Sequence, residues 1–591
     1  MGGIRHAVRA AVYGVAVAVL GLSCSADPDG GADDEALTAA VEAHVTALAG
    51  FGFNGVVLVS RVGGIVVHEA VGLAEPGRPV TTRTVFDIAS ITKGFTAAGV
   101  LEAERRGLVA TLAPITELLD SVPPDKRAIT LSHLLTHTSG LPRNLGSDYD
   151  TVTAGALVAA AMDADLAALP GVRYRYSNAG YSLLAALLQR TAGMPYDTVL
   201  ARWFFEPLGM TRTGRPPAGV GREDVITYHA PRTTFASPLD RPDTVWNLIG
   251  NGGLLSTAGD LHRWIRGLVD GRVLDATARD QALSARVRVR PGRDYGLGWF
   301  ISDTPWGDRQ VWHSGGSAEG VGAELHWYRW ADVVIIVLSS GVLDGTLPAA
   351  DVVRDIEDLV FGAAAEARQL PTARRAWADD RPAPGRRVTP DGAVIEVREA
   401  GDTVVLVLPD AAATAALARF PQHGTPTRRR AAYETAGRVF NAMVDGDYGE
   451  FRELLWSEVP FEGEEAFWSD AIAQLTEARG RFQGIRFFAT ARDGAELEHL
   501  GLARFGDGHQ LIRVHERPSG RLYFFTTPGF ELPTTFAMRP VAGGGMAAFD
   551  FRFDALVELR AADDGRLLIL TRDGTVEASP AGDDAPADRL D

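Results

Sequence analysis

The stretch FDIASITKGF, residues 86–95, places Lys93 three positions after Ser90. The chain contains only two lysines among 58 basic residues, so nearly every other basic side chain is Arg. Arg keeps its proton near neutral pH, whereas a buried Lys can lose its own. Because positions i and i+3 of a helix share a face, the Ser90 hydroxyl and the Lys93 amine can touch. The stretch therefore predicts a nucleophile that has its own base.

The position of Ser90 at a helix start adds to this prediction. An apolar-periodic run follows it through Leu101, so Ser90 is expected in the first turn, where its backbone N–H is unpaired and can face an oxyanion. Such a serine also needs a second proton carrier, a group that positions the substrate amide and a strand edge with another oxyanion donor. Two segments offer these groups: Tyr176 and Asn178 in YRYSNAGY, just before a helix, and His313, Ser314, Gly315 and Gly316 at the end of a strand.

The order Ser-x-x-Lys, Tyr-x-Asn and His-x-Gly resembles the serine β-lactamase and penicillin-binding-protein superfamily. It is most similar to the class C-like branch, which also holds esterases and D-amino-acid peptidases. The segments LLTHTSGLP at 134–142, GGLLSTAGDL at 252–261 and YGLGW at 295–299 resemble further family segments. Three motifs in this order are far more specific than Ser-x-x-Lys alone, and the resemblance covers about residues 40–360.

The resemblance implies a role for each motif residue. Ser90 is expected to be the acylated nucleophile, and Lys93 is expected to take or relay its proton. Tyr176 shares that role and later protonates the leaving group, while Asn178 holds Lys93 and the substrate amide. The backbone N–H groups of Ser90 and Gly316 are expected to form the oxyanion hole. This chemistry uses no metal and no cofactor.

Two departures from the family pattern affect substrate binding. His313 stands where the β-lactamases usually carry Lys, and a histidine is mostly neutral at pH 7, so we expect a weaker grip on a substrate carboxylate. Residues 317–320, SAEG, replace the Pro-Gly that often follows the motif.

A separate pair, His133 and His137, has the i, i+4 spacing of a zinc pair, but Leu134 stands where a metalloprotease needs Glu. Two structural histidines are the favoured interpretation.

The distribution of periodic segments predicts an α+β domain over residues 39–362, of the β-lactamase/transpeptidase type. Strands are expected at both ends of this segment, and helices are expected between them, so one sheet should be built from both ends. The expected strands are 55–60, 65–71, 296–301, 310–313, 321–328 and 332–338, and the expected helices include 154–162 and 181–191.

The N-terminus has the pattern of a secretory signal. Arg5 and Arg9 precede an apolar run at 10–22, which is too short for a stable transmembrane helix. Cys24, the only cysteine, follows this run. Residues 1–24 resemble a bacterial lipoprotein signal peptide with lipidation at Cys24, although Gly21 stands where Leu is usual; plain secretion with an incidental cysteine is the alternative. Residues 25–38 are predicted to be a solvated acidic tether.

The C-terminal part has a different composition. Residues 363–390 are rich in Arg, Pro and Asp and are predicted to be a linker. Residues 391–580 are predicted to form a smaller α+β accessory region, with helices at 428–444 and 448–455 and strands from 485 onward. Two helices before a curled sheet resemble the NTF2-like cone fold. Residues 581–591 are expected to be a disordered acidic tail.

Charge and motifs together limit the function. A net charge of −17 argues against a nucleic-acid partner. The favoured hypothesis is an extracytoplasmic, membrane-anchored serine hydrolase that cleaves a small-molecule or peptide ester or amide, such as a D-amino-acid peptide, a β-lactam or a small ester. The alternatives are a penicillin-binding sensor or scaffold without turnover, whose C-terminal module binds a ligand, and a cell-wall remodelling enzyme.

Overall fold

The computed structural model describes residues 30–50, 53–227 and 237–361, apart from 243, 307, 317–320 and 341–348, and most of 382–580. The gaps in the last stretch are 391–393, 401–402, 419–425, 446–472, 474–475, 478–479, 494–495, 507, 517–521, 526–534, 541–545, 551–554, 562–565 and 572–573. The predicted signal peptide with Cys24, the predicted helix at 448–455 and the tail at 581–591 lie outside the described residues. Within the described part, no helix is long and apolar enough to cross a bilayer.

An eight-stranded antiparallel sheet forms the centre of the N-terminal domain, in the order β2-β1-β12-β11-β10-β9-β8-β7. The first hairpin lies beside the last strand, with Gly55 opposite Ser339, so the sheet is built from both ends of the segment, as predicted. The strands are β1 (Gly55–Arg61), β2 (Gly64–Val71), β7 (Val287–Arg290), β8 (Arg293–Tyr295), β9 (Phe300–Asp303), β10 (Arg309–Gly316), β11 (Val321–Tyr328) and β12 (Val333–Ser340).

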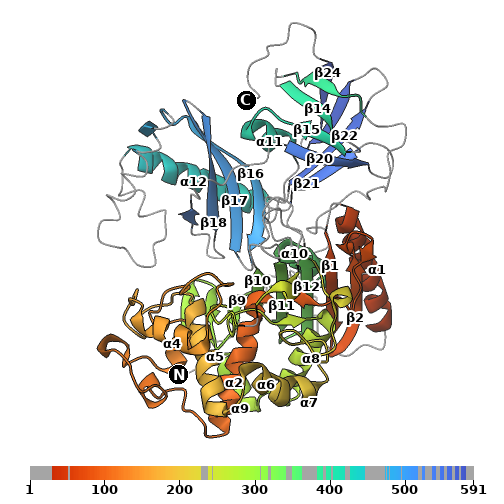
Figure 1. Ribbon diagram of the computed structural model, residues 1–591. Helices are drawn as coiled ribbons and strands as arrows, with labels where there is room; N and C mark the ends of the chain where they lie inside the picture. The colour runs from red at the N-terminus through yellow and green to blue at the C-terminus, as the bar shows by residue number, and fades with distance from the viewer. Residues whose placement is uncertain are drawn as a thin grey trace, which may run out of the picture.

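Helices form the middle of this domain and pack against the sheet (Figure 1). Local sequence fixes their ends: in α5 the Ser177 side chain accepts a hydrogen bond from Gly180 N, and Gly193 ends the helix with a left-handed φ of 64°. One apolar core joins α2, α5 and α8 to the sheet through residues such as Phe95, Leu183 and Trp264. The longer helices are α2 (Thr92–Arg105), α4 (Ala154–Asp163), α5 (Asn178–Ala192), α8 (Ala258–Val269) and α10 (Ala349–Val360).

The tether predicted at 25–38 is helical in its second half, because α1 (Gly30–Gly50) begins inside it. Leu37 is buried in a cluster with residues of β1, β12 and α10, and Asp34 pairs with Arg61 at 2.6 Å. Acidic residues near a helix N-terminus favour the helix, since they interact with the positive end of its dipole. The acidic composition that suggests a solvated tether therefore marks a helix start.

The C-terminal region consists of two parts rather than one α+β unit. Eight strands close into a barrel in the order β13-β14-β15-β20-β21-β22-β23-β24. The predicted linker at 363–390 extends too far, because β13 (Gly385–Val388) pairs with β14 on one side and β24 on the other. The remaining barrel strands are β14 (Val394–Ala400), β15 (Thr403–Val407), β20 (Thr535–Pro540), β21 (Met546–Asp550), β22 (Ala555–Ala561), β23 (Leu567–Thr571) and β24 (Gly574–Pro580).

The second part is inserted between β15 and β20. Helix α12 (Pro426–Asp445) packs on a four-stranded antiparallel sheet of β16 (Gly484–Asp493), β17 (Glu496–Phe505), β18 (Gly508–Glu516) and β19 (Leu522–Phe525). The sequence predicts a single α+β region over residues 391–580, and the inserted part is the portion in which a helix packs on an open sheet. The barrel, whose strands precede and follow this part in the sequence, depends on long-range pairing, which strand periodicity alone does not reveal.

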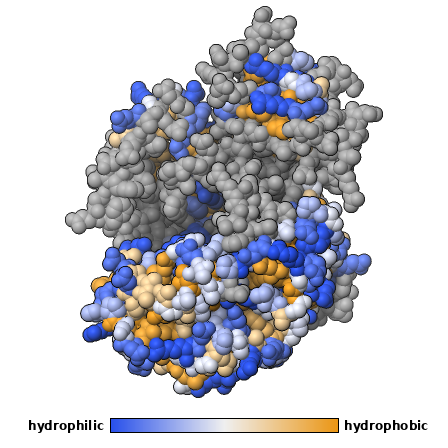
Figure 2. Space-filling view, in the orientation of Figure 1, coloured by the Kyte–Doolittle hydropathy of each residue, from blue (hydrophilic) through white to orange (hydrophobic). Residues whose placement is uncertain are grey.

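The inserted sheet contacts the N-terminal domain through an ion pair. Arg290, at the end of β7, places Nη1 2.6 Å from Glu496 Oε2, at the start of β17. Glu496 is buried and Arg290 is half-buried, so water reaches this pair only from the arginine side. Figure 2 shows hydrophilic and hydrophobic residues interspersed over the visible face of the N-terminal domain. That mixture is ordinary for a folded surface, where apolar atoms still supply much of the exposed area.

Candidate active site

The turn that carries Ser90 is a short 3₁₀ helix, η1 (Ala89–Ile91), which leads directly into α2. Ala89 has a φ of 41°, which is uncommon for a residue with a side chain. The Asp87 side chain accepts a hydrogen bond from Ala89 N at 2.8 Å, and Ile88 N donates to Leu254 O at 3.0 Å. These bonds hold a strained backbone immediately before Ser90, as is common at functional sites.

Lys93 lies one helical turn after Ser90 and is fully buried. Its Nζ is 3.0 Å from Ser90 Oγ and 2.7 Å from the Asn251 carbonyl oxygen. Burial lowers the pKa of Lys93 well below its usual range; the charge of Arg143 adds to this effect, and that of Asp148 opposes it. A neutral amine can donate to Asn251 and still offer its lone pair to the Ser90 hydroxyl, so the geometry suits a base.

Tyr176 is the second proton carrier next to Ser90. Lys93 Nζ lies 4.8 Å from the centre of the Tyr176 ring. Burial raises the pKa of Tyr176 above its usual value, while a hydrogen bond with Ser90 and the Arg143 charge act in the opposite direction. The phenol is therefore protonated at neutral pH, and its O–H is available to donate.

The His137 ring packs against the Tyr176 ring. Its ring centre lies 4.3 Å from that of Tyr176, and its Nδ1 accepts a hydrogen bond from Ser177 N at 3.0 Å. Burial lowers the pKa of His137 well below its usual value, so the ring is neutral. His133 instead accepts a hydrogen bond from Thr130 N in a helix cap. The two histidines thus have separate packing and capping roles.

The end of β10 lies against the Ser90 turn, and Gly315 makes this approach possible. A Cβ added at Gly315 would stand 2.2 Å from the Ile88 carbonyl oxygen and 3.2 Å from Ala89 Cβ. Only a residue without a side chain fits there. Gly316 follows and is exposed, and Ser314 is half-buried. The strand end therefore sits beside the turn from which the Ser90 N–H arises.

His313 is buried behind Tyr176, with 6.5 Å between the two ring centres. Burial lowers the pKa of His313 to about 3, and the charge of Lys93 adds to this effect. Its Nδ1 lies 2.7 Å from the Ser314 carbonyl oxygen, so the proton of the neutral ring is on Nδ1, and Nε2 accepts from the Tyr295 hydroxyl at 3.3 Å. His313 is neutral, as expected, but both ring nitrogens are occupied, so it supports the site rather than gripping a carboxylate.

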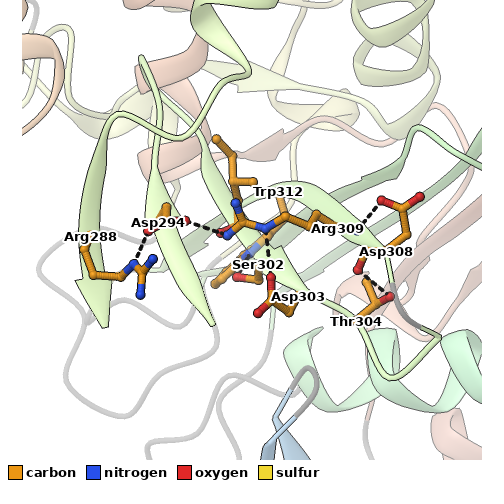
Figure 3. A network of polar contacts seen from close by, with 9 residues as sticks. Arg288, Asp294, Ser302, Asp303, Thr304, Asp308, Arg309 and Trp312 are labelled. Atoms are coloured by element: carbon orange, nitrogen blue, oxygen red, sulfur yellow. Dashed lines mark hydrogen bonds and ion pairs between the residues drawn. The ribbon is translucent and has the colours of Figure 1, made fainter. Parts of the chain in front are cut away.

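A network of ion pairs holds the strands that carry Tyr295 and His313 together (Figure 3). The Asp294 carboxylate, at the centre of β8, accepts hydrogen bonds from Arg288 and from Arg309 Nη2, the latter at 2.7 Å. Arg309 also pairs with Asp303 at 2.9 Å. Because these residues come from β7, β8, β9 and β10, the network fixes β8 against β10 and keeps Tyr295 beside His313.

Asn178 occupies a different position from the expected one. Its Nδ2 donates to Asn144 Oδ1 at 2.8 Å, and the amine of Lys93 bonds the Asn251 carbonyl instead. The Asn178 Oδ1 is buried and accepts no hydrogen bond from the described residues. The prediction that Asn178 holds Lys93 is therefore wrong for this structure, whereas its free acceptor suits a substrate amide N–H.

Sequence reasoning missed three groups at the site: the Asn251 carbonyl, the Arg143 guanidinium and the Asp148 carboxylate. Asn251 acts through its backbone, which side-chain motifs do not reveal, although GGLLSTAGDL begins at the next residue. Arg143 and Asp148 lie on the loop after LLTHTSGLP, whose conformation depends on contacts with α5. The structure brings together Ser90, Lys93, Tyr176, His137, Asn251, Arg143, His313 and the 314–316 strand end.

Comparison with known proteins shows the family of the N-terminal domain. Residues 41–357 match the family model described as Beta-lactamase. The chain belongs to this family. It is 29% identical over 353 residues to penicillin-binding protein 4* of Bacillus subtilis, covering 56% of this chain and 77% of the relative. It is 28% identical to esterase EstB of Burkholderia gladioli, covering 49% and 86% of the respective chains.

A third relative is the D-alanyl-D-alanine-carboxypeptidase/endopeptidase AmpH of Escherichia coli, which is 32% identical over 37% of this chain and 58% of that protein. Among solved structures, the octameric penicillin-binding protein homologue from Pyrococcus abyssi aligns with a TM-score of 0.51 at 19% identity, covering 83% of this chain and 98% of the other. That likeness concerns the fold alone, and it extends beyond the N-terminal domain. As a member of the Beta-lactamase family, the chain is an enzyme of the serine hydrolase superfamily.

Proposed function

We propose that the protein hydrolyses an ester or amide through an acyl-enzyme on Ser90. The observation that carries this proposal is the 3.0 Å contact between Ser90 Oγ and a fully buried amine whose pKa is lowered. A buried lysine that forms no ion pair with a carboxylate of the described residues would be costly if it stayed charged, so the neutral form is the one that the fold favours.

The first half-reaction follows from the arrangement. Ser90 Oγ attacks the substrate carbonyl carbon while Lys93 Nζ takes its proton. The negative oxygen that forms is stabilised by the N–H groups of Ser90 and Gly316, and loss of one such donor typically costs about a hundredfold to a thousandfold in rate. Tyr176 donates its proton to the leaving oxygen or nitrogen and recovers one from Lys93. The bond to the leaving group breaks, and the acyl group remains on Ser90.

The second half-reaction repeats these steps with water. Water loses a proton to the neutral Lys93 amine and attacks the acyl carbonyl, the acid is released as the bond to Ser90 Oγ breaks, and Ser90 regains its proton from Lys93. Asn178 Oδ1 is the proposed acceptor for a substrate amide N–H, because it is buried and accepts no hydrogen bond from the described residues. The substrate classes proposed are esters and amides, as the names of the relatives suggest: an esterase and a D-alanyl-D-alanine-carboxypeptidase.

We also propose that the enzyme works outside the cytoplasm and is tethered by a lipid on Cys24. The support is the charged and apolar pattern of residues 1–24 with the single cysteine at its end. Metabolic labelling with a palmitate analogue tests this: the wild type should be labelled in the membrane fraction, and Cys24→Ser should not.

The catalytic proposal is tested by turnover of a chromogenic ester and by labelling with a fluorescent phosphonate. Wild type should do both, and Ser90→Ala should do neither while melting at a similar temperature. Labelling at Ser90 without turnover would instead favour a penicillin-binding sensor. Turnover that persists in Ser90→Ala would refute the proposal.

A further inference from the structure

A buried ion pair lies next to the Ser90 turn. The Asp87 carboxylate uses both of its oxygens: Oδ1 accepts a hydrogen bond from Ala89 N at 2.8 Å, and Oδ2 pairs with the Arg241 guanidinium. The side chains of Asp87 and Arg241 are only 3% and 7% exposed. Asp87 ends β5 (Phe86–Asp87), which pairs with β6 (Leu255–Ser256). Arg241 lies 154 positions after Asp87 in the sequence, and none of the three motifs includes it.

The hydrogen bond from Ala89 N to Asp87 is strong because its acceptor is a carboxylate. Ala89 has a φ of 41°, and a residue with a side chain keeps such a conformation only where its surroundings hold it. A hydrogen bond to an ionised carboxylate is about twice as strong as one between neutral groups. A carboxylate buried alone would be costly, whereas a cation in contact with it offsets that cost. Arg241 therefore allows a charged acceptor to hold the amide that precedes Ser90.

Arg241 also joins the Ser90 turn to a second loop of the site. Its guanidinium carbon lies 5.4 Å from the centre of the Tyr149 ring. The segments that carry Tyr149 and Arg241 are held to each other, since Val152 N donates to the Thr244 carbonyl oxygen at 2.8 Å. One guanidinium thus contacts both the turn that carries the nucleophile and the loop beside it.

We propose that Arg241 is a positioning residue for acylation: through Asp87 it holds the Ala89 amide, and so it sets the direction of the Ser90 N–H and hydroxyl. This inference rests on the proposed acyl-enzyme at Ser90. Arg241 touches no reacting group in this assignment and acts only through Asp87. Its removal should therefore slow the formation of the acyl-enzyme and leave the binding of the ester almost unchanged.

Rescue of Arg241→Ala by free guanidinium tests this proposal. The truncation leaves room for the ion next to Asp87, and a cavity of about 80 Å³, lined by Arg241, Leu248 and Gly253, adjoins that room. In stopped-flow acylation by a chromogenic ester, Arg241→Ala should lower the maximal rate about tenfold to a hundredfold, since a displacement of about 1 Å can cost this much. The ester concentration that gives half of the maximal rate should change less than about threefold. Millimolar guanidinium chloride should raise the rate of the variant at least about fivefold, and urea, which is planar but uncharged, should not.

Two single variants complete the design. Arg241→Lys keeps the cation and should lose less than Arg241→Ala, although lysine lacks the planar fork. Arg266→Ala is the matched control, because Arg266 is also half-buried in an ion pair, with Asp332 at 2.8 Å, and makes no contact with the Ser90 turn among the described residues. Arg266→Ala should acylate within about threefold of wild type and should not respond to guanidinium.

A neutral pair replaces the truncation if Arg241→Ala does not fold. The double variant of Asp87→Asn and Arg241→Gln should acylate at the same rate as Asp87→Asn alone, because Arg241 acts through the charge of Asp87. A double variant at least about tenfold slower than Asp87→Asn would overturn the proposal.

The outcomes for Arg241→Ala are equally distinct. A maximal acylation rate within about threefold of wild type would overturn the proposal. A change in the half-saturating ester concentration alone would also overturn it and make Arg241 a substrate-binding residue. A loss that neither guanidinium nor Arg241→Lys recovers would leave Arg241 with a structural role only and would refute positioning. A wild type that forms no acyl-enzyme would instead refute the proposed function.

Discussion

Replacing Gly315 by alanine should separate β10 from the Ser90 turn. The added Cβ would stand 2.2 Å from the Ile88 carbonyl oxygen and 3.0 Å from the Ile88 carbonyl carbon. Both atoms are backbone, so no side chain can rotate away. A relaxed carbon–oxygen contact is about 3.4 Å, so the strand or the turn must move by about 1 Å.

A displacement of about 1 Å between the reacting groups can cost about a hundredfold in rate. We therefore expect Gly315→Ala to lower kcat/KM for a chromogenic ester by about a hundredfold, with the loss mainly in kcat. Overpacking of this kind also destabilises a protein by about 1–3 kcal/mol, so the variant should remain folded with a lower melting temperature.

The matched control is Gly155→Ala in α4, where an added Cβ would meet nothing within 4 Å. Because Ala favours a helix over Gly by about 0.5–1 kcal/mol, this variant should be slightly more stable and fully active. Melting curves establish that Gly315→Ala is folded. A folded Gly315→Ala with kcat/KM within threefold of wild type would refute the placement of β10 against the Ser90 turn.

Three further perturbations test other parts of the structure. Because the pKa of Lys93 is lowered, the rate of acylation should rise with pH through that pKa. Lys93→Arg, which cannot deprotonate, should acylate at least about a hundredfold more slowly at every pH in stopped-flow measurements. A pH profile that is the same in wild type and in Lys93→Arg would argue against Lys93 as the base. In a double-mutant cycle, Arg290→Gln and Glu496→Gln should show a coupling of about 1–3 kcal/mol in urea unfolding, and additive effects would mean that the domains are not held by this pair. Burial lowers the pKa of His326, but hydrogen bonds to two buried glutamates outweigh burial and raise the pKa to about 9. Up to about 3 kcal/mol of stability present below pH 6.5 should therefore be lost as the pH rises toward 9. His326→Gln should flatten this dependence of the unfolding free energy on pH, and an unchanged dependence would assign it to another group.

The sequence was informative where local rules decide the structure. The Ser90–Lys93 spacing, the first hairpin and the last three strands of the N-terminal sheet follow from helix faces and strand periodicity. The family resemblance then implied that the strand end at 313–316 faces the serine. The structure confirms that Ser90, Lys93 and Tyr176 meet.

The features that the sequence missed depend on contacts between distant segments. The Asn251 carbonyl reaches Lys93 across 158 positions, and no side-chain motif marks a backbone oxygen. The barrel closes through the pairing of Val388 with Ser579, so its strand count is not visible in local periodicity. His313 was correctly expected to be neutral, but its occupied nitrogens depend on Tyr295, which comes from another strand.

The most direct measurement of the central claim is intact-protein mass spectrometry of the enzyme quenched in acid during turnover of an activated ester. A lysine-activated serine should carry one acyl group, located by peptide mapping at Ser90, and Ser90→Ala should carry none. An acyl group on a different residue, or turnover with Ser90 unmodified at every quench time, would contradict the account.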